Sequence, residues 1–455
     1  MSHATAQYTV MFTARHRQAP PTTPGADMAE PPPKATAVDR SAMWASRGDD
    51  LPVGFLLDVQ GPPPSLDALR DLAARRLPHL PALHRLLPRR DGTIPPAPPT
   101  PVGTHVKELL PDPHTPSQAA TGHHALNAPL PSKDAAPWDL WLIRGTDPHA
   151  YRLCYRIHHA LQDGVGAAHT VAALLGGPGN RGPYPHLPRR PTRAALRRVT
   201  GQFTASWGPV PHWPRLSAPP AGRPVLVHAD VPARRLRALA RARGTTVNDV
   251  YLAALARAFR SLNGGGTTSG GCPPLPALVP MSTRTAGQEH LPGNQVVAMR
   301  VLLPSHLPAP ADCLRQVHRQ TALATAAGQR DAMRLILSAV PDAAGAWFVR
   351  RMALPRTTPL YASSVAFPTP LTCLGGRVTA AAMFTGITRG LLCYVSLTGY
   401  EDTRRFTVVH DRAFTGGDRL PELWLDALDA LDIPDARAVL DAPGGPEREP
   451  GRLGP

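Results

Sequence analysis

A pair of adjacent histidines is the part of this sequence best suited to chemistry. His158 and His159 follow the alternating segment 151–157 and precede Asp163 and Gly164. Histidine is the side chain whose ordinary pKa lies nearest neutrality, so an imidazole exposed at a strand end can take a proton from a substrate hydroxyl. Successive strand residues point to opposite faces, so one histidine should face a substrate while the other packs behind it. The residues alone do not choose between the two, and a purely structural pair is the alternative.

The residues after the pair should lock the loop that carries it. Asp163 is expected to accept free backbone N–H groups at the start of a helix over 166–175. Gly164 and Gly166 are expected to let the backbone turn sharply before that helix. A role for Asp163 in positioning the histidines follows from this placement.

Apolar periodicity predicts the elements that must position this loop. In the first half, strands are predicted at 53–59, 139–143 and 151–157, with a helix at 65–77 capped by Ser65. In the second half, strands are predicted at 225–231, 277–280, 296–303 and 391–398, and helices at 232–243, 246–262 and 420–431. Helices and strands mix throughout both halves, so the fold class is α/β or α+β.

The chain length and the Pro-rich segments indicate two halves. A chain of 455 residues exceeds the roughly 250–300 residues at which single cores tend to divide. We predict disordered tails at 1–37 and 441–455, a first half at 38–177, a Pro- and Arg-rich crossover at 178–224, and a second half at 225–440.

The charge balance is strongly basic. The formal net charge is +16, and only three of the 49 basic residues are lysines. An anionic membrane surface or a phosphorylated ligand would suit this charge, and a general replacement of lysine by arginine is the alternative. Nucleic acid is a poor candidate partner, because the arginines are spread along the chain and aromatic residues make up only 5%.

Cysteine and metal-ligand patterns point away from a redox or metal protein. The five cysteines are odd in number and contain no CxxC pair, which predicts neither a disulfide framework nor a zinc site. The histidine pair with Asp163 and His169 does not supply the three or four suitably spaced ligands that a metal needs.

No stretch reaches the ~18 apolar residues of a spanning helix. A cytoplasmic location, with any membrane contact peripheral, is the expectation.

Residues 158–164 (HHALQDG) resemble the HHxxxDG signature of the CoA-dependent acyltransferase superfamily, which includes chloramphenicol acetyltransferase and peptide-synthetase condensation domains. Further segments resemble the wax ester synthase/diacylglycerol acyltransferase family in order along the chain. They are Pro137-Trp138, which is similar to that family's PLW, then 246–250 (TVNDV), 280–284 (PMSTR), 293–294 (GN) and 303–304 (LP). The resemblance covers roughly residues 38–435.

One segment departs from the family pattern. Where the family usually shows an Asn-Val-Pro-Gly-Pro-like turn, this chain has 363–368 (SSVAFP). The usual asparagine and glycine are missing from this altered turn at Ser364. The change bears on acceptor choice or activity if that turn shapes the substrate tunnel. Neutral drift in a loop is the alternative.

The resemblance implies a fold of two chloramphenicol-acetyltransferase-like mixed-sheet halves with a substrate tunnel between them. It implies that His159 is the general base, that His158 lies behind it, and that Asp163 and Gly164 are structural. It also assigns motif support to Asn248, Asp249 and Asn294. The two asparagines are candidate oxyanion donors, with helix capping and turn formation as alternatives. Arg223 and Arg284 are expected either to meet the phosphates of CoA or to brace the core.

The implied reaction transfers a long-chain acyl group from acyl-CoA to diacylglycerol or a fatty alcohol. Acyl-CoA is then a co-substrate, and no cofactor or metal is required. The lipid acceptor implies peripheral contact with the inner membrane face, a lipid droplet or a lipid inclusion. Two alternatives remain: a condensation-type transfer on carrier-bound or natural-product substrates, and an inactive binding protein of the same fold.

Overall fold

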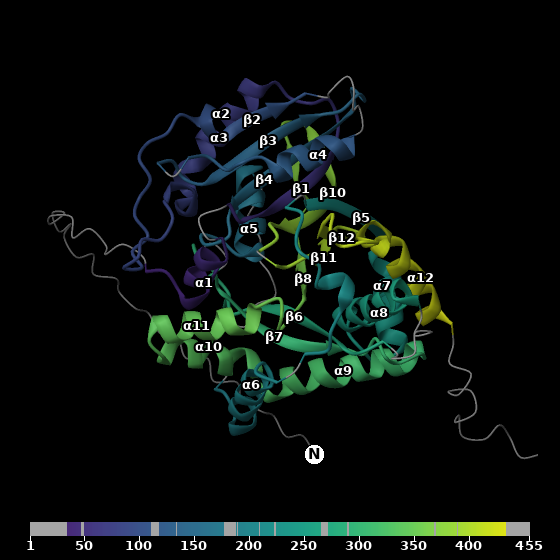
Figure 1. Cartoon of the computed structure of the whole chain (residues 1–455). Coiled ribbons are helices and arrows are strands. Elements are labelled where there is room, and N and C mark those ends of the chain that lie inside the picture. The colour runs from purple at the N-terminus through teal and green to yellow at the C-terminus, as the bar shows by residue number, and fades with distance from the viewer. Residues whose placement is uncertain are drawn as a thin grey trace, which may run out of the picture. The chain divides into compact units, whose positions relative to one another are not determined.

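The computed structural model describes residues 34–46, 50–110, 118–132, 134–176, 188, 190–208, 210–222, 224–264, 272–288, 291–367, 370–388 and 390–433. Two mixed sheets of six strands each form its framework (Figure 1). This architecture confirms the predicted fold class, in which helices and strands mix in both halves.

The first sheet carries the histidine pair. Its order is β2-β3-β4-β1-β10-β9, and all neighbours are antiparallel except β2 and β3. The bounds are β1 Pro52–Gln60, β2 Val106–Leu109, β3 Trp138–Arg144, β4 Ala150–His158, β9 Thr372–Cys373 and β10 Gly376–Thr385. His158 is the last residue of β4 and pairs with Pro52 at the start of β1.

The second sheet has the order β5-β12-β11-β8-β6-β7. Its strand β8 runs parallel to both neighbours, β11 and β6, and the other pairs are antiparallel. The bounds are β5 Pro224–Pro232, β6 Leu275–Ser282, β7 Val296–Leu303, β8 Leu360–Ala366, β11 Cys393–Tyr400 and β12 Thr403–Asp411. Ser396 on β11 donates to the Met383 carbonyl on β10, which links the two sheets.

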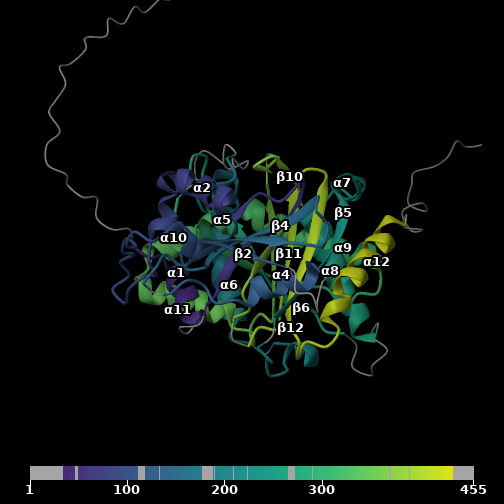
Figure 2. The same ribbon diagram turned by 90° about the horizontal axis from the view of Figure 1, so that it is seen from above.

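Helices pack against both sheets. Their bounds are α1 Ala37–Ser46, α2 Leu66–Arg76, α3 Val102–His105, α4 Gln118–Asn127, α5 Gly164–Leu174, α6 Arg193–Ala205, α7 Ala233–Ala242, α8 Val247–Leu262, α9 Pro310–Ala327, α10 Gln329–Ala339, α11 Asp342–Ala353 and α12 Leu420–Asp432. Apolar side chains of α2 and α5 pack on the first sheet, and those of α8, α9 and α12 pack on the second. In both views α1, α6, α10 and α11 gather at one end of the second sheet (Figures 1 and 2).

Several predicted elements are confirmed with slightly different bounds, and others were missed. The alternation of β4 is confirmed, because Leu153, Tyr155 and Ile157 share the core with α2 and α5. Ser65 caps α2 as expected.

The helix α6 lies inside the predicted crossover, and β9 and β10 come from the predicted second half but complete the first sheet. The predicted boundary at 177–178 falls outside the described residues.

The beginning of the described chain is ordered earlier than expected. Within the predicted tail, Ala35 N–H donates to the Gly92 carbonyl at 2.8 Å, and α1 begins at Ala37. None of the helices in the described part of the chain is long and apolar enough to cross a membrane.

Candidate active site

His159 lies directly after β4 and faces a cavity. Its backbone N–H donates to the Leu51 carbonyl at 2.8 Å, which fixes the residue beside the start of β1. Within the described structure its Nδ1 atom is buried without a hydrogen-bond partner, and the residue lines that cavity. His158 is buried, and its Nδ1 accepts the Ala160 N–H at 3.2 Å. The two histidines are therefore unequal, and the structure places His159 toward the open side.

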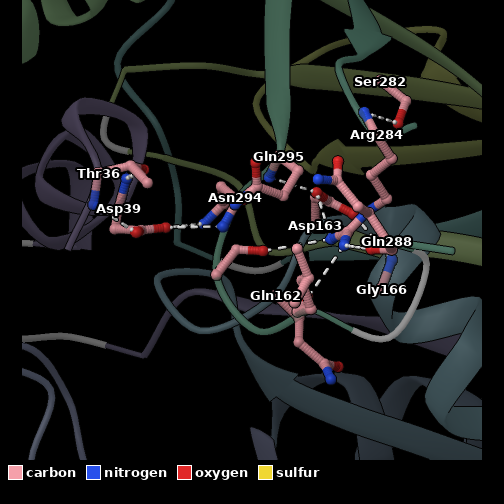
Figure 3. A network of polar contacts seen from close by, with 12 residues as sticks. Thr36, Asp39, Gln162, Asp163, Gly166, Ser282, Arg284, Gln288, Asn294 and Gln295 are labelled. Atoms are coloured by element: carbon pink, nitrogen blue, oxygen red, sulfur yellow. Dashed lines mark hydrogen bonds and ion pairs between the residues drawn. The ribbon is translucent and has the colours of Figure 1, made fainter. Parts of the chain in front are cut away.

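Asp163 is more than a helix cap. Its Oδ1 accepts the Gly166 N–H at 2.8 Å, so the predicted cap of α5 is confirmed. Its Oδ2 accepts both Arg284 Nη2 at 2.9 Å and the Gln295 N–H at 2.7 Å (Figure 3). The guanidinium of Arg284 is fully buried, so this ion pair joins the histidine loop to the second half. The arrangement supports bracing by Arg284, since its Nη1 and Nη2 atoms also donate to the backbone carbonyls of Gln288, Leu291 and Gly293.

The segment 293–295 docks against the histidine loop through its backbone and one amide. Gly293 N–H donates to the Leu161 carbonyl at 2.7 Å, and its φ of 80° lies in the left-handed region that favours glycine. Asn294 Nδ2 donates to the His159 carbonyl at 2.6 Å. Asn294 thus holds the backbone of His159, and its amide donors are already engaged. This contact supports a positioning role for Asn294 and gives no support to an oxyanion role.

Asp39 completes this support from α1, although the sequence analysis gave it no site role. Its Oδ1 accepts both the backbone N–H of Asn294 at 2.9 Å and the Nδ2 at 2.7 Å (Figure 3). Thr36 and Asp39 also cap each other across the start of α1. Burial raises the pKa of the Asp39 carboxyl, although hydrogen bonds from Asn294 and Thr36 oppose that rise. The Thr36-x-x-Asp39 spacing is close to a capping box and is the signal that could have located this helix start.

Gly164, the last residue of the motif, and Gly166 serve close packing. The prediction that they make a sharp turn is wrong, because both lie inside α5 without a positive φ. A Cβ at Gly166 would lie 3.0 Å from Arg284 Nη2, and one at Gly164 would lie 2.3 Å from the Met383 side chain. Gly166 therefore lets the buried guanidinium approach the helix start.

Asn248 and Asp249 lie at the start of α8, whose N-cap is Thr246. Asp249 accepts a hydrogen bond from Thr321 at 2.6 Å and contacts His318 Nδ1 at 2.8 Å, both on α9. Burial would raise the pKa of Asp249, but these contacts outweigh burial and lower it. Asp249 thus ties α8 to α9. Neither Asn248 nor Asp249 lines the cavity that His159 faces.

Of the remaining predicted residues, Ser364 does not line the cavity that His159 faces. Arg223 lies outside the described residues. Ser364 lies on β8 with its side chain exposed, whereas the neighbouring Ser363 is buried and lines the cavity. The segment around Ser364 is a strand through Ala366, where a turn was expected. The alternation of β8 explains why Ser363, and not Ser364, reaches the cavity.

The cavity beside His159 is predominantly apolar. It encloses about 1160 Å³ of empty space, including its opening to solvent. Its walls come from α1, α10 and α11 and from strands of the second sheet. Apolar lining residues include Val38, Ala42, Met333, Leu337, Phe348 and Met352. Such a lining suits an apolar ligand, with the His159 imidazole as one of few polar groups.

Tyr394 also lines this cavity. The residue lies on β11, is almost fully buried, and its Oη has no hydrogen-bond partner in the described structure. Burial raises the pKa of this phenol well above its ordinary value. Ser363 and Ser396 lie near enough to oppose this rise in pKa, but neither meets Oη in hydrogen-bond geometry. The hydroxyl therefore keeps its proton and remains available as a donor.

The fold places the chain among two-lobed, chloramphenicol-acetyltransferase-like proteins. The wax ester synthase/diacylglycerol acyltransferase from Marinobacter aquaeolei VT8 superposes with a TM-score of 0.58 at 18% identity, over 88% of this chain and 98% of that one. A mutant starter condensation domain of rhizomide synthetase, in complex with C8-CoA, superposes with a TM-score of 0.58 at 14% identity, over 89% and 98%. At these sequence identities, both matches show a shared fold and nothing more specific.

Sequence comparison then identifies the family. The wax ester synthase/diacylglycerol acyltransferase catalytic domain matches residues 54–217, and the C-terminal domain of the same family matches residues 292–432. A probable diacylglycerol O-acyltransferase of Mycobacterium tuberculosis is 27% identical over 417 residues, covering 83% of this chain and 89% of the relative. The chain belongs to the wax ester synthase/diacylglycerol acyltransferase family and is an acyltransferase.

Proposed function

We propose that the protein transfers a long-chain acyl group from acyl-CoA to the hydroxyl of diacylglycerol or a fatty alcohol, with His159 as general base. The observation that carries this proposal is the placement of His159, which lines a large, mainly apolar cavity directly after β4. An apolar cavity favours acyl chains over charged acceptors, because burying an unpaired charge is costly. The similarity to proteins named diacylglycerol O-acyltransferase supports the lipid acceptor.

In the proposed reaction, the neutral imidazole removes the proton of the acceptor hydroxyl as its oxygen attacks the thioester carbonyl carbon. Nε2 takes that proton, so Nδ1 must carry the ring's other proton. The carbon–sulfur bond of the tetrahedral intermediate then breaks, and the CoA sulfur receives the proton from Nε2. The products are an ester and free CoA. Asn294 and the Asp163–Arg284 pair hold the loop and therefore position His159 for both transfers.

Tyr394 is the donor that we assign to an oxygen of the bound substrate. Tyr394→Phe should raise the free energy of unfolding by about 1 kcal/mol, because it removes a buried hydroxyl that lacks a partner. The same change should lower turnover about tenfold, the equivalent of one lost hydrogen bond. Urea unfolding and steady-state release of CoA measure the two effects. A variant that is less stable than wild type, or equally active, would contradict this assignment.

The reaction itself is tested by mass-spectrometric product analysis. Purified protein receives palmitoyl-CoA together with diacylglycerol, hexadecanol and a primary amine in one mixture. We expect triacylglycerol or wax ester and an equal amount of free CoA, with His159→Ala as the matched control that forms about a hundredfold less of both, or lower still. Amide without ester would replace the lipid proposal with condensation chemistry, for which the likeness to condensation domains provides a basis. Folded protein that forms no product would favour the binding-protein alternative.

A further inference from the structure

Three exposed tryptophans cluster on one surface of the protein. Trp44 at the end of α1, Trp207 after α6 and Trp347 on α11 have 38%, 57% and 46% of their surface exposed. Together with Arg350, Arg351, Leu354 and Arg356 they line a shallow surface hollow, which we call the tryptophan patch. Large exposed aromatic groups of this kind are unusual on a protein surface that contacts only water.

The rings of the patch are held in place by one another and by arginines. Trp207 and Trp347 lie 5.8 Å apart between ring centroids, and Phe203 contacts both. The guanidinium of Arg350 lies 5.2 Å from the Trp44 ring centroid, and that of Arg351 lies 4.7 Å from the Trp207 centroid. The patch is therefore preorganised and combines aromatic surface with fixed positive charge.

The helices around the patch are strongly basic. The helices α6, α10 and α11 carry seven arginines and two aspartates, a net of five positive charges. Both aspartates are paired with arginines, Asp331 with Arg330 and Asp342 with Arg40. An occupant of this surface should be anionic and should have an apolar layer for the tryptophan rings. Charge complementarity thus favours an anionic lipid surface over a neutral protein partner.

The tryptophan patch and the apolar cavity share their walls. On α11, Trp347 and Arg350 line the patch, while Phe348 and Met352 line the cavity. On α1, Trp44 lies at the patch, and the preceding turn lines the cavity with Ala42. Figures 1 and 2 show α1 beside α11 at the same end of the molecule. The patch therefore lies on the outer side of the cavity wall.

We propose that the tryptophan patch docks this acyltransferase on the surface of an anionic lipid bilayer. Tryptophan rings settle at the level of lipid headgroups, where an apolar ring and a polar N–H are both accommodated. The neighbouring arginines meet the lipid phosphates, and each basic group adds to the attraction. Docking by this face brings the wall of the cavity against the bilayer, and its benefit for catalysis rests on the proposed lipid acceptor. The docking itself is independent of that acceptor.

Binding of the full-length protein to vesicles tests the proposal. Vesicles of phosphatidylcholine alone, or mixed with phosphatidylglycerol, are sedimented with the protein at low and high salt. We expect binding to the mixed vesicles that weakens as salt rises, because salt screens the arginine–phosphate attraction. The variants Trp207→Ala/Trp347→Ala and Arg350→Glu/Arg356→Glu should each lower vesicle affinity by about tenfold or more.

Matched controls lie on the opposite side of the molecule. Arg237→Glu/Arg241→Glu on α7 makes the same change of charge at exposed positions, and Ile433→Ala removes an apolar side chain that is 68% exposed. Both controls should bind vesicles as wild type does. The proposal would be overturned if the wild-type protein did not bind the anionic vesicles, or if the patch variants bound them with wild-type affinity. So would a charge-reversal variant that raises the KM for acyl-CoA while binding vesicles normally, because its arginines would then serve the coenzyme.

An assay with a water-soluble alcohol separates docking from the chemistry. Patch variants should transfer acyl groups to that alcohol at the wild-type rate, because none of the four substituted residues lines the cavity. Wild-type protein that binds vesicles but acylates no alcohol would refute the proposed function and leave docking intact. Wild-type protein that acylates the soluble alcohol but binds no vesicles would refute docking alone.

Discussion

Replacing His159 by alanine should lower turnover by about 10²–10⁴-fold, the usual contribution of a general base. The fold should survive, because the His159 ring makes no hydrogen bond in the described structure and faces the cavity. The backbone contacts that hold the loop, to Leu51 and Asn294, remain in the variant. Release of CoA at saturating acyl-CoA measures the rate, and the melting temperature checks the fold.

His158→Ala is the matched control for this experiment. The His158 side chain is 1% exposed, and its Nδ1 accepts the Ala160 N–H, so its loss leaves a buried donor unpaired. We expect a lower melting temperature and a smaller loss of turnover than for His159→Ala. A His159→Ala protein with wild-type turnover would remove the general base from the mechanism. A His158→Ala protein that is stable and inactive would show that His158, and not His159, acts as the general base.

The local part of this site could be predicted from sequence. The alternation of β4, the position of the pair at its end and the cap from Asp163 to Gly166 all involve residues near one another in the chain. The same holds for the helix starts at Ser65 and Thr246, where a side chain meets a backbone N–H three residues later. Short-range hydrogen bonds of this kind have sequence signatures because the spacing alone determines the geometry.

The long-range part could not be predicted. Arg284 meets Asp163 across 121 residues, Asn294 meets the His159 carbonyl across 135, and Asp39 meets Asn294 across 255. These partners depend on how the two sheets pack, and no local pattern encodes that packing. The prediction for Gly166 was wrong for the same reason. The side chain that packs closely against Gly166 is Arg284, which comes from the second half of the chain.

Strand β10 shows a second limit of local patterns. Its sequence contains three consecutive alanines at 380–382, and alanine is not enriched in strands. It nevertheless forms a strand because β1 supplies its hydrogen-bond partners on one side, and from Ala380 onward both faces are buried. Tertiary context therefore overrides propensity here, and the contribution of the second half to the first sheet follows from that pairing.

Substitutions at Asp163 should have the largest effect on stability. Asp163→Ala should lower the free energy of unfolding by about 3–5 kcal/mol, because it leaves the buried Arg284 guanidinium without its counter-charge. A residue that served only as a helix cap would cost about 0.5–2 kcal/mol and would tolerate asparagine. Turnover should fall as well, because the loop that positions His159 loses its attachment to Gln295.

Asp163→Asn distinguishes the ion pair from the cap. Asparagine has one acceptor oxygen, whereas the N–H groups of Gly166, Gln295 and Arg284 approach both oxygens of the carboxylate. In either orientation of the amide, its NH₂ group faces another donor, and the positive charge of Arg284 stays uncompensated. We therefore expect a loss close to that of Asp163→Ala, whereas a residue that only capped the helix would tolerate asparagine. Arg377→Ala, which breaks the exposed pair with Glu401, is the control and should cost no more than about 1 kcal/mol. Urea unfolding of the three variants measures these differences, and an Asp163→Asn protein as stable as wild type would show that the cap alone matters.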